Sequence, residues 1–175
     1  VTAAAQATVE GSLLATYRFA ATKQEPEPPH AIDTLTIVEF DGGKVAAIET
    51  GSVQAQAIAA GVAIARDLVN MPPNVATPTK LAETAVSIAH EYSLNITVGD
   101  RAWAAEHNMG GFLAVAKGAG EPPKFIVLEH NGDRDDLDTI VLVGKGITFD
   151  TGGISIKPSE RMEAMKSDMG GAAAV

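Results

Sequence analysis

The chain of 175 residues has no cysteine, few aromatic residues, a shortage of basic residues and no long apolar run. The lack of cysteine excludes disulfides, Cys-ligated zinc and a thiol nucleophile, and it fits a reducing cytoplasm. No stretch approaches the roughly 18 apolar residues of a membrane-spanning helix, so we expect no transmembrane segment. Thirteen Lys and Arg against 22 Asp and Glu give a net charge of −9. This balance argues against nucleic acid as a partner of these residues.

What the sequence does contain is the composition of a folded chain. Apolar residues make up 46% and charged residues 20%, whereas disorder needs low hydrophobicity together with high net charge. Residues 1–20 begin with Val1 and lack the basic start and apolar core of a signal peptide. Residues 170–175 form an apolar run without a capping residue. From these two ends we expect a piece of a longer protein.

The sequence pattern predicts three parts. Residues 1–50 form the end of a smaller α/β domain. Residues 51–70 form a linking helix, because apolar residues recur at three- and four-residue steps until Pro72. Residues 71–175, in which strands alternate with helices, form the first part of a second domain.

Two local features are predicted within residues 1–50. Gln24–His30 is rich in proline, which fixes φ and removes a donor, so a loop is expected. Thr34–Phe40 alternates in character and is rich in strand-forming residues, and Asp41–Gly43 supplies a turn before Val45–Ile48. This arrangement predicts a β-hairpin.

Helices and strands alternate in residues 71–175. Thr77 suits the N-cap, and Pro78 the first turn, of a helix that runs to about Tyr92. Asp100 is expected to cap a short helix that ends near His107. The predicted strands are Leu94–Val98, Phe112–Ala116, Phe125–Leu128 and Thr139–Val143. The last two are nearly continuous apolar runs, which are typical of strands buried on both faces. The predicted fold class is therefore α/β, with helices covering a mostly parallel or mixed sheet.

Residues suited to chemistry gather after the last predicted strand. Lys145, Asp150 and Lys157 lie in a glycine-rich loop, and Asp168 lies at the start of the next predicted helix. Catalytic and ligand sites of open α/β sheets collect at the carboxyl ends of strands. We therefore expect the functional site in Val143–Val175.

Three interpretations of this segment stay open on the residues alone. Phe149–Gly153 resembles the phosphate loop of sugar-kinase and actin-like ATPases, although the Gly-x-x-x-x-Gly-Lys-Ser/Thr spacing is absent. Alternatively, Asp168 caps the final helix and both lysines are solvated. The third interpretation is a metal site of carboxylates and lysine. Because the four histidines show no ligand spacing, such a metal would be bound mainly by oxygen.

Four stretches of Val143–Val175 carry a resemblance to a known family. They read Val-Gly-Lys-Gly, Thr-Phe-Asp-Thr-Gly-Gly, Ser-Ile-Lys-Pro and Met-Lys-Ser-Asp-Met-Gly-Gly. Together with Arg66–Asn74 and the pair Thr77–Pro78, they make the chain similar to the leucyl (cytosol) aminopeptidase family from about Ala60 onward. The resemblance implies an incomplete catalytic domain of a metallo-aminopeptidase, preceded by the end of the family's N-terminal domain.

The resemblance also implies a role for five residues. Lys145, Asp150 and Asp168 match metal ligands. Lys157 matches the catalytic lysine, which also contacts the substrate, and Met165 matches a residue of the pocket for the substrate's first side chain. Lys145 ligates only as a neutral amine, so the metal and burial must lower its pKa. Lys157 instead stays charged and stabilises the oxyanion of the tetrahedral intermediate.

The activity implied is that of a metallo-exopeptidase. Two divalent ions, Mn²⁺ or Zn²⁺ with Mg²⁺ or Co²⁺ as alternatives, share a hydroxide that releases N-terminal leucine and similar residues from peptides. The family further implies a cytoplasmic homohexamer. It needs an Asn-Thr-Asp-Ala-Glu-Gly-Arg motif, which supplies two more carboxylate ligands and an arginine, and these 175 residues do not contain it. We therefore expect the 175 residues alone to be inactive.

Other functions stay open beside this one. The chain is alternatively a catalytically inactive aminopeptidase-like scaffold, or a protein that moonlights in DNA binding. A more remote alternative is an actin-like ATPase. Thermal stabilisation by Mn²⁺ or Zn²⁺ but not by Mg-ATP would exclude the ATPase.

Overall fold

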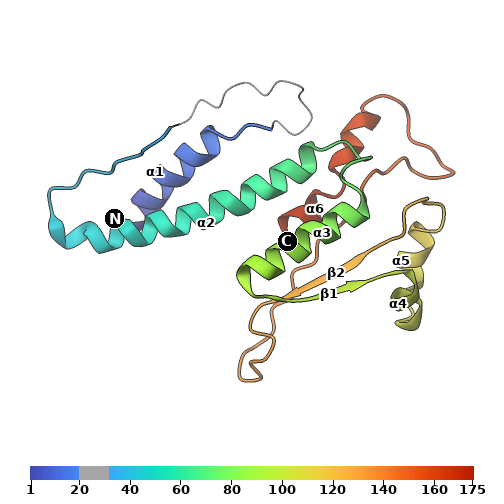
Figure 1. Cartoon of the computed structure of the whole chain (residues 1–175). Coiled ribbons are helices and arrows are strands. Elements are labelled where there is room, and N and C mark those ends of the chain that lie inside the picture. Colours follow the sequence, from blue (N-terminus) through green and yellow to red (C-terminus); the bar gives the residue numbers. More distant parts are fainter. Residues whose placement is uncertain (20–31) are drawn as a thin grey trace. The chain divides into compact units, whose positions relative to one another are not determined.

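The computed structural model describes residues 1–19 and 32–175, which form two compact units, Val1–Met71 and Pro72–Ala173. The predicted loop Gln24–His30 lies outside the described residues. The elements follow the chain in the order α1 (Thr2–Ala15), η1 (Gly42–Lys44), α2 (Val45–Asn70), α3 (Pro78–Tyr92), β1 (Asn95–Gly99), α4 (Arg101–Glu106), α5 (Gly110–Val115), β2 (Phe125–Glu129), η2 (Met162–Ser167) and α6 (Gly170–Ala174) (Figure 1).

The first unit is built on two helices that lie side by side, α1 and α2 (Figure 1). Their contact surface consists of small and branched residues: Ala5, Val9, Ala55 and Ala59 are buried. Gly51 marks the closest approach, because a Cβ on this residue would meet the backbone of Thr2 and Gln6. The two helices therefore pack with their backbones close together.

Polar contacts join the other ends of the same helices. Tyr17 Oη donates to Asp67 Oδ1 at 2.7 Å, and Arg66 Nη1 donates to the Leu14 carbonyl at 3.2 Å. The Arg66 guanidinium also lies 5.3 Å from the centre of the Tyr17 ring. Burial, helped by the bond to Asp67, raises the pKa of Tyr17. Since Thr2 lies near Gly51 and Tyr17 near Asp67, α1 and α2 run in the same direction.

The predicted hairpin is wrong, and the predicted linking helix is longer than expected. The described residues 32–40 contain no strand, and α2 begins at Val45 rather than Gly51. Asp41 accepts a hydrogen bond from the Gly43 N–H at 3.0 Å, which starts the turn η1 that leads directly into α2. The end of the helix is confirmed: Asn70 is its last residue, and Met71 is extended before Pro72.

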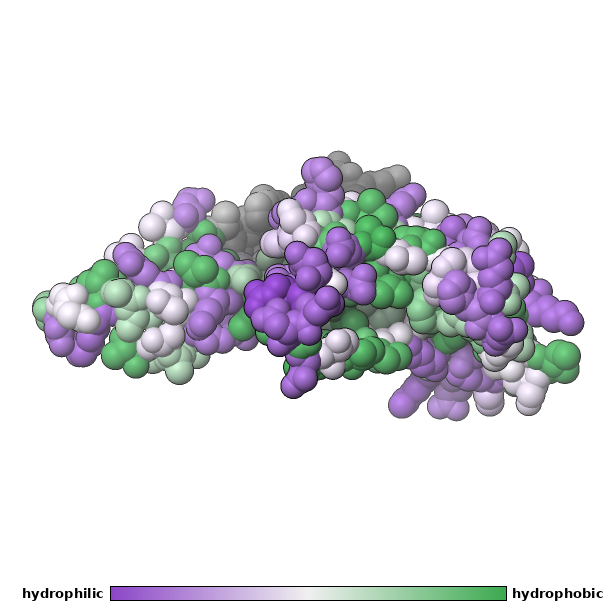
Figure 2. Space-filling view, turned by 90° about the horizontal axis from the view of Figure 1, so that it is seen from below, coloured by the Kyte–Doolittle hydropathy of each residue, from purple (hydrophilic) through white to green (hydrophobic). Residues whose placement is uncertain are grey.

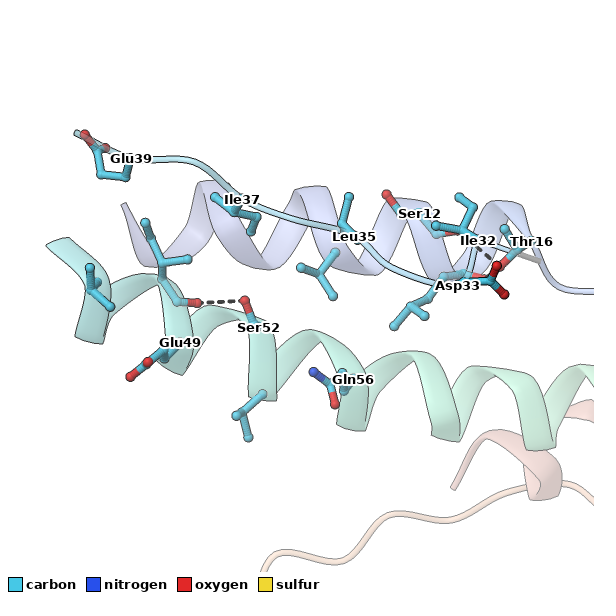
Figure 3. Close-up of a pocket in the computed structure, with 15 residues that line it drawn as sticks. Ser12, Thr16, Ile32, Asp33, Leu35, Ile37, Glu39, Glu49, Ser52 and Gln56 are labelled. Carbon is cyan, nitrogen blue, oxygen red and sulfur yellow. Dashed lines mark hydrogen bonds between the residues drawn. The ribbon is translucent and has the colours of Figure 1, made fainter. Parts of the chain in front are cut away.

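A groove lies between α1, α2 and the extended residues 32–39. Its volume is about 720 Å³. Figure 3 shows Leu35 and Ile37 of the extended segment on one side and Ser52 and Gln56 of α2 on the other. The groove is lined wholly by residues of the first unit, and none of them is a residue that the sequence singles out for chemistry.

The second unit packs α3 on an antiparallel pair of strands. The Thr77 hydroxyl accepts from the Lys80 N–H at 3.3 Å, and Pro78 opens α3, as predicted. Strands β1 and β2 pair from Asn95 with Glu129 to Gly99 with Phe125. The buried side of α3 lies toward them and consists of Leu81, Ala82, Ala85 and Ala89.

Three aromatic residues of this unit contact one another. Trp103 stacks on Phe125 at 5.6 Å between centroids, and Phe112 meets Phe125 edge-on at 5.7 Å. Asp100 caps α4 through the Trp103 N–H at 2.9 Å, which confirms the predicted cap. Gly99 leaves room for the indole, because a Cβ there would overlap the Trp103 ring.

Two of the four predicted strands are confirmed and two are wrong. Residues 94–98 and 125–128 correspond to β1 and β2 within one residue. Phe112–Val115 instead falls in the helix α5, of which Ala116 is the C-cap, and Thr139–Val143 makes no strand pairing. The α/β class is correct, although the sheet in the described residues is one antiparallel pair rather than a mostly parallel or mixed one.

Large apolar side chains remain at the surface of both units, as the green residues of Figure 2 illustrate. Phe40 is fully exposed, and so is Ile154. Of the helices in residues 1–19 and 32–175, none is long and apolar enough to cross a bilayer.

Two glycines of α2 provide a test of the helix packing. Gly51→Ala should destabilise the chain by about 1–3 kcal/mol, because its methyl group is forced against the backbone of α1. Gly61→Ala is the matched control: nothing lies within 4 Å of its Cβ, so the gain in helix propensity should stabilise by about 0.5–1 kcal/mol. Urea unfolding followed by circular dichroism measures both. Equal effects of the two substitutions would contradict the packing described.

Candidate metal centre

The candidate site is assembled by a close contact between two backbone segments. The Ala172 N–H at the start of α6 donates to the Lys145 carbonyl at 2.8 Å. A Cβ on Gly144 would overlap the backbone of Gly171 and Ala172. Glycine at position 144 is therefore required for the two segments to meet, and their contact brings Lys145 beside the residues that precede α6.

Lys145 forms an ion pair with Asp168. The distance from Nζ to Oδ2 is 2.7 Å, and the Asp168 side chain is 20% exposed. Asp168 Oδ2 is buried, and among the residues described no group bonds to it with hydrogen-bond geometry. Contact with Asp168, helped by the charge of Asp150, raises the pKa of the Lys145 ammonium. The attraction of opposite charges is thus the main compensation for burying this oxygen.

The expectation for Lys145 concerns its metal-bound form, in which the metal and burial lower its pKa. In the chain by itself the Lys145 side chain is 59% exposed and its pKa is raised. The reason is the neighbouring carboxylate, which favours the charged form more than partial desolvation disfavours it. The chain's own residues therefore hold Lys145 as an ammonium ion.

A second ion pair joins Lys157 to Asp150. Lys157 Nζ donates to Asp150 Oδ2 at 2.8 Å, and the Gly152 N–H donates to Asp150 Oδ1, also at 2.8 Å. The bond from Lys157, followed by that from Gly152, lowers the pKa of Asp150. The Lys157 N–H donates to the Thr151 carbonyl at 2.8 Å and closes the loop between them. Both oxygens of Asp150 are consequently held.

Met165 completes the group of predicted residues. It lies in η2, and its Sδ is 3.1 Å from Lys157 Nζ. Its carbonyl accepts from the Asp168 N–H at 3.2 Å, so one turn connects Met165 with Asp168. Met169, which follows, has no exposed surface and anchors this turn. The structure therefore joins all five predicted residues in two groups, Lys145 with Asp168 and Lys157 with both Asp150 and Met165.

The geometry speaks against two of the three interpretations left open by the sequence. Asp168 does not cap α6, whose N-cap residue is Met169 and which has no side-chain cap. Neither lysine is simply a solvated surface charge, because each has a carboxylate within 2.8 Å of its Nζ. A phosphate loop needs backbone N–H groups free for the ligand, but the Gly152 N–H is already bound to Asp150.

The donor set fits part of a divalent cation site. Two carboxylates offer the oxygen ligands that hard cations prefer, and the buried Asp168 Oδ2 already has a cationic partner, the Lys145 ammonium at 2.7 Å. Residues 1–19 and 32–175 contain no group of three or more His, Cys, Asp or Glu placed to hold a metal. A site with more than two ligands from this part of the chain therefore needs a donor of another kind, and Lys145 is the candidate beside Asp168.

The glycines of the loop expected from the sequence position the ligands, and Gly171 is the one among them that was not expected to do so. None of these glycines has a reactive side chain. Gly144 and Gly171 allow the backbone contact, and Gly152 donates its N–H to Asp150. Gly152 and Gly153 have φ of 88° and 73°, which only glycine adopts readily. The paired glycines in the sequence were the available signal.

Comparisons with known proteins indicate the same family that the sequence motifs resemble. A sequence model described as the cytosol aminopeptidase family, catalytic domain, matches residues 63–175. The chain is 46% identical to a probable cytosol aminopeptidase of Syntrophotalea carbinolica, over 100% of this chain and 36% of that protein. It is 50% identical to the cytosol aminopeptidase of Pseudomonas aeruginosa, over 91% of this chain and 32% of that protein. The chain thus spans about a third of the length of the curated relatives it matches.

Solved structures resemble the fold as well. The bottromycin maturation enzyme BotP in complex with Mn aligns with a TM-score of 0.78 and 35% identity, covering 98% of this chain and 34% of that one. The leucine aminopeptidase LAP1 of Caenorhabditis elegans aligns with a TM-score of 0.64 and 35% identity, covering 70% and 25%. These findings confirm the resemblance stated from the motifs and the α/β fold class.

The pKa of Asp150 tests the second ion pair. Removing the charge in Lys157→Gln should raise this pKa toward the ordinary aspartate value, because the bond from Lys157 is the largest cause of its lowering. Lys145→Gln is the control and should raise it less, because Lys145 acts on Asp150 through charge alone. Carboxyl NMR titration with chelator present measures both. A larger effect of Lys145→Gln would contradict the pairing.

In the unsubstituted chain, the stability contributed by the pair Lys157–Asp150 should be lost as the pH falls through the lowered pKa of Asp150.

Proposed function

The chain belongs to the cytosol aminopeptidase family, and from this membership we propose that it forms part of a two-metal aminopeptidase. The proposed reaction releases N-terminal residues, leucine and similar ones, from peptides. The observation that carries the proposal is the pair Lys145–Asp168, in which a buried carboxylate oxygen lies 2.7 Å from the ammonium, together with the charge of Asp150 acting on the same lysine. The names of the relatives support peptide substrates.

Three residues are proposed to hold the metals. Asp150 and Asp168 offer short anionic side chains, and Lys145 lies 2.7 Å from Asp168 and is also affected by the charge of Asp150. As a ligand, Lys145 must give up the proton that Asp168 now stabilises. When bound, two divalent ions would lower the pKa of a water molecule, which then acts as a nucleophile at neutral pH, and they would also act as Lewis acids. Mn²⁺ or Zn²⁺ is proposed, with Mg²⁺ or Co²⁺ as alternatives; the manganese complex of BotP supports a divalent ion.

Lys157 is proposed as the electrophile of the reaction. Its ammonium carries three protons, of which one binds Asp150 and a second points to the Met165 sulfur. The third is available for the carbonyl oxygen of the scissile bond, where negative charge develops in the transition state. Met165 is proposed to line the pocket for the first side chain of the substrate, for which a soft thioether is suited.

The domain division and location are proposed on the same basis. Residues 1–50 are the end of an N-terminal domain, 51–70 a linking helix and 71–175 the first part of the catalytic domain. The match of the family's catalytic domain to residues 63–175 supports this division. A cytoplasmic location is supported by the names of the relatives, which are cytosol aminopeptidases.

The two lysines provide the sharpest test of the proposed roles in the full-length protein. Lys145→Ala should lower metal content and peptidase activity together, and excess metal should restore part of each. Lys157→Ala should leave metal content nearly unchanged and reduce kcat by about 10²–10³-fold, as loss of one oxyanion donor does. Metal analysis and the hydrolysis of a leucine anilide measure both. The opposite pattern would show that the roles are exchanged, and full activity of both variants would refute the proposed site.

Assembly and completeness are proposed from the family. We expect the full-length protein to form a homohexamer, and the 175 residues alone to show no peptidase activity, because they contain only part of the family's ligand set. Light scattering of the full-length protein and an anilide assay of the 18.0 kDa chain check these expectations. A monomer in the first measurement or robust hydrolysis in the second would contradict the corresponding claim.

A further inference from the structure

The Lys157 ammonium is shared between a strong and a weak acceptor. Its Nζ lies 2.8 Å from Asp150 Oδ2 and 3.1 Å from Met165 Sδ. A carboxylate is a strong charged acceptor, whereas a thioether sulfur is a weak one. Asp150 is therefore the stronger partner of the Lys157 ammonium, and Met165 is the weaker one.

Oxidation of the sulfur would reverse this preference. A sulfoxide is polar, and its oxygen is a far better acceptor than a thioether sulfur. Because Nζ already touches the sulfur, an oxygen bonded to that sulfur lies within reach of the ammonium. We propose that Met165 is a site of reversible oxidation by peroxide, and that its sulfoxide draws Lys157 away from Asp150 and switches the site off. The effect on catalysis rests on the proposed function of Lys157.

The chemistry balances with hydrogen peroxide as the oxidant. A sulfur lone pair of Met165 attacks one peroxide oxygen, the O–O bond breaks and an S–O bond forms. The proton of the attacked oxygen ends on the departing oxygen, which leaves as water. The thioether is oxidised by two electrons and the peroxide is reduced. A methionine sulfoxide reductase reverses the change with two thiols, which become a disulfide as water is released.

Neighbouring methionines provide controls within the same turn. Met165 and Met162 are both half-buried in η2, whereas Met169 has no exposed surface. Peroxide therefore reaches Met165 and Met162 but not Met169. Of the two accessible residues, Met165 is the one whose sulfur meets Lys157. Oxidation of Met162 gives the effect of a sulfoxide in η2 without that contact.

The experiment treats the full-length protein with hydrogen peroxide and follows each methionine by peptide mass spectrometry. Met165 should gain one oxygen while Met169 stays unmodified, and peptidase activity should fall about tenfold or more as the electrophile is displaced. Methionine sulfoxide reductase should restore the activity. Met165→Leu, compared with its own untreated activity, should resist peroxide, whereas Met162→Leu should lose activity as the unsubstituted protein does.

A second readout does not depend on peptidase activity. In chelator-treated protein, the Asp150 carboxyl carbon should shift in the NMR spectrum on oxidation of the unsubstituted protein, but not of Met165→Leu. An unchanged Asp150 signal with Met165 fully oxidised would overturn the proposal, and so would equal inactivation of Met165→Leu. If the proposed function fails, the untreated protein lacks activity, yet the Asp150 signal still decides whether Lys157 moves.

Discussion

The candidate site depends on the backbone contact between Gly144–Lys145 and Gly171–Ala172. The Ala172 N–H reaches the Lys145 carbonyl at 2.8 Å, at a place where a Cβ on residue 144 has no room. Asp168 precedes Gly171 by less than one helical turn, so this contact also determines where its carboxylate lies. A pair separated by 23 positions in the sequence is thereby brought to 2.7 Å.

Charge balance explains why lysines accompany both carboxylates. A buried carboxylate oxygen is costly unless it is paired, and the Lys145 ammonium at 2.7 Å offsets the burial of Asp168 Oδ2. Lysine supplies a compact point charge and needs no fixed fork of donors, in contrast to arginine. Pairs that are this exposed contribute little to stability. Four charges gathered in glycine-rich loops are therefore better explained by chemistry than by folding.

The sequence predicted local features well and pairing poorly. Thr77, Pro78 and Asp100 start helices through their own side chains, and Pro72 ends one by excluding its neighbour from the helical region, so these boundaries needed no tertiary information. A strand needs a partner that lies elsewhere in the chain. Phe112–Ala116 and Thr139–Val143 share the composition of β2, yet one is mostly helical and the other unpaired in the described residues. The chemical residues were predictable by type, but which lysine meets which carboxylate was not.

The two ion pairs depend on the fold to different degrees. Asp150 and Lys157 are seven residues apart, and their loop is closed by its own bonds, from Gly152 N–H to Asp150 and from Lys157 N–H to Thr151. This half of the site is local and forms wherever the loop forms, at a small loss of chain entropy. Lys145 and Asp168 meet only once α6 has docked on Gly144. The pair Lys145–Asp168 therefore forms only when residues 144–172 have folded as a whole. A ligand that binds Asp150 together with Asp168 stabilises the folded arrangement of both residues.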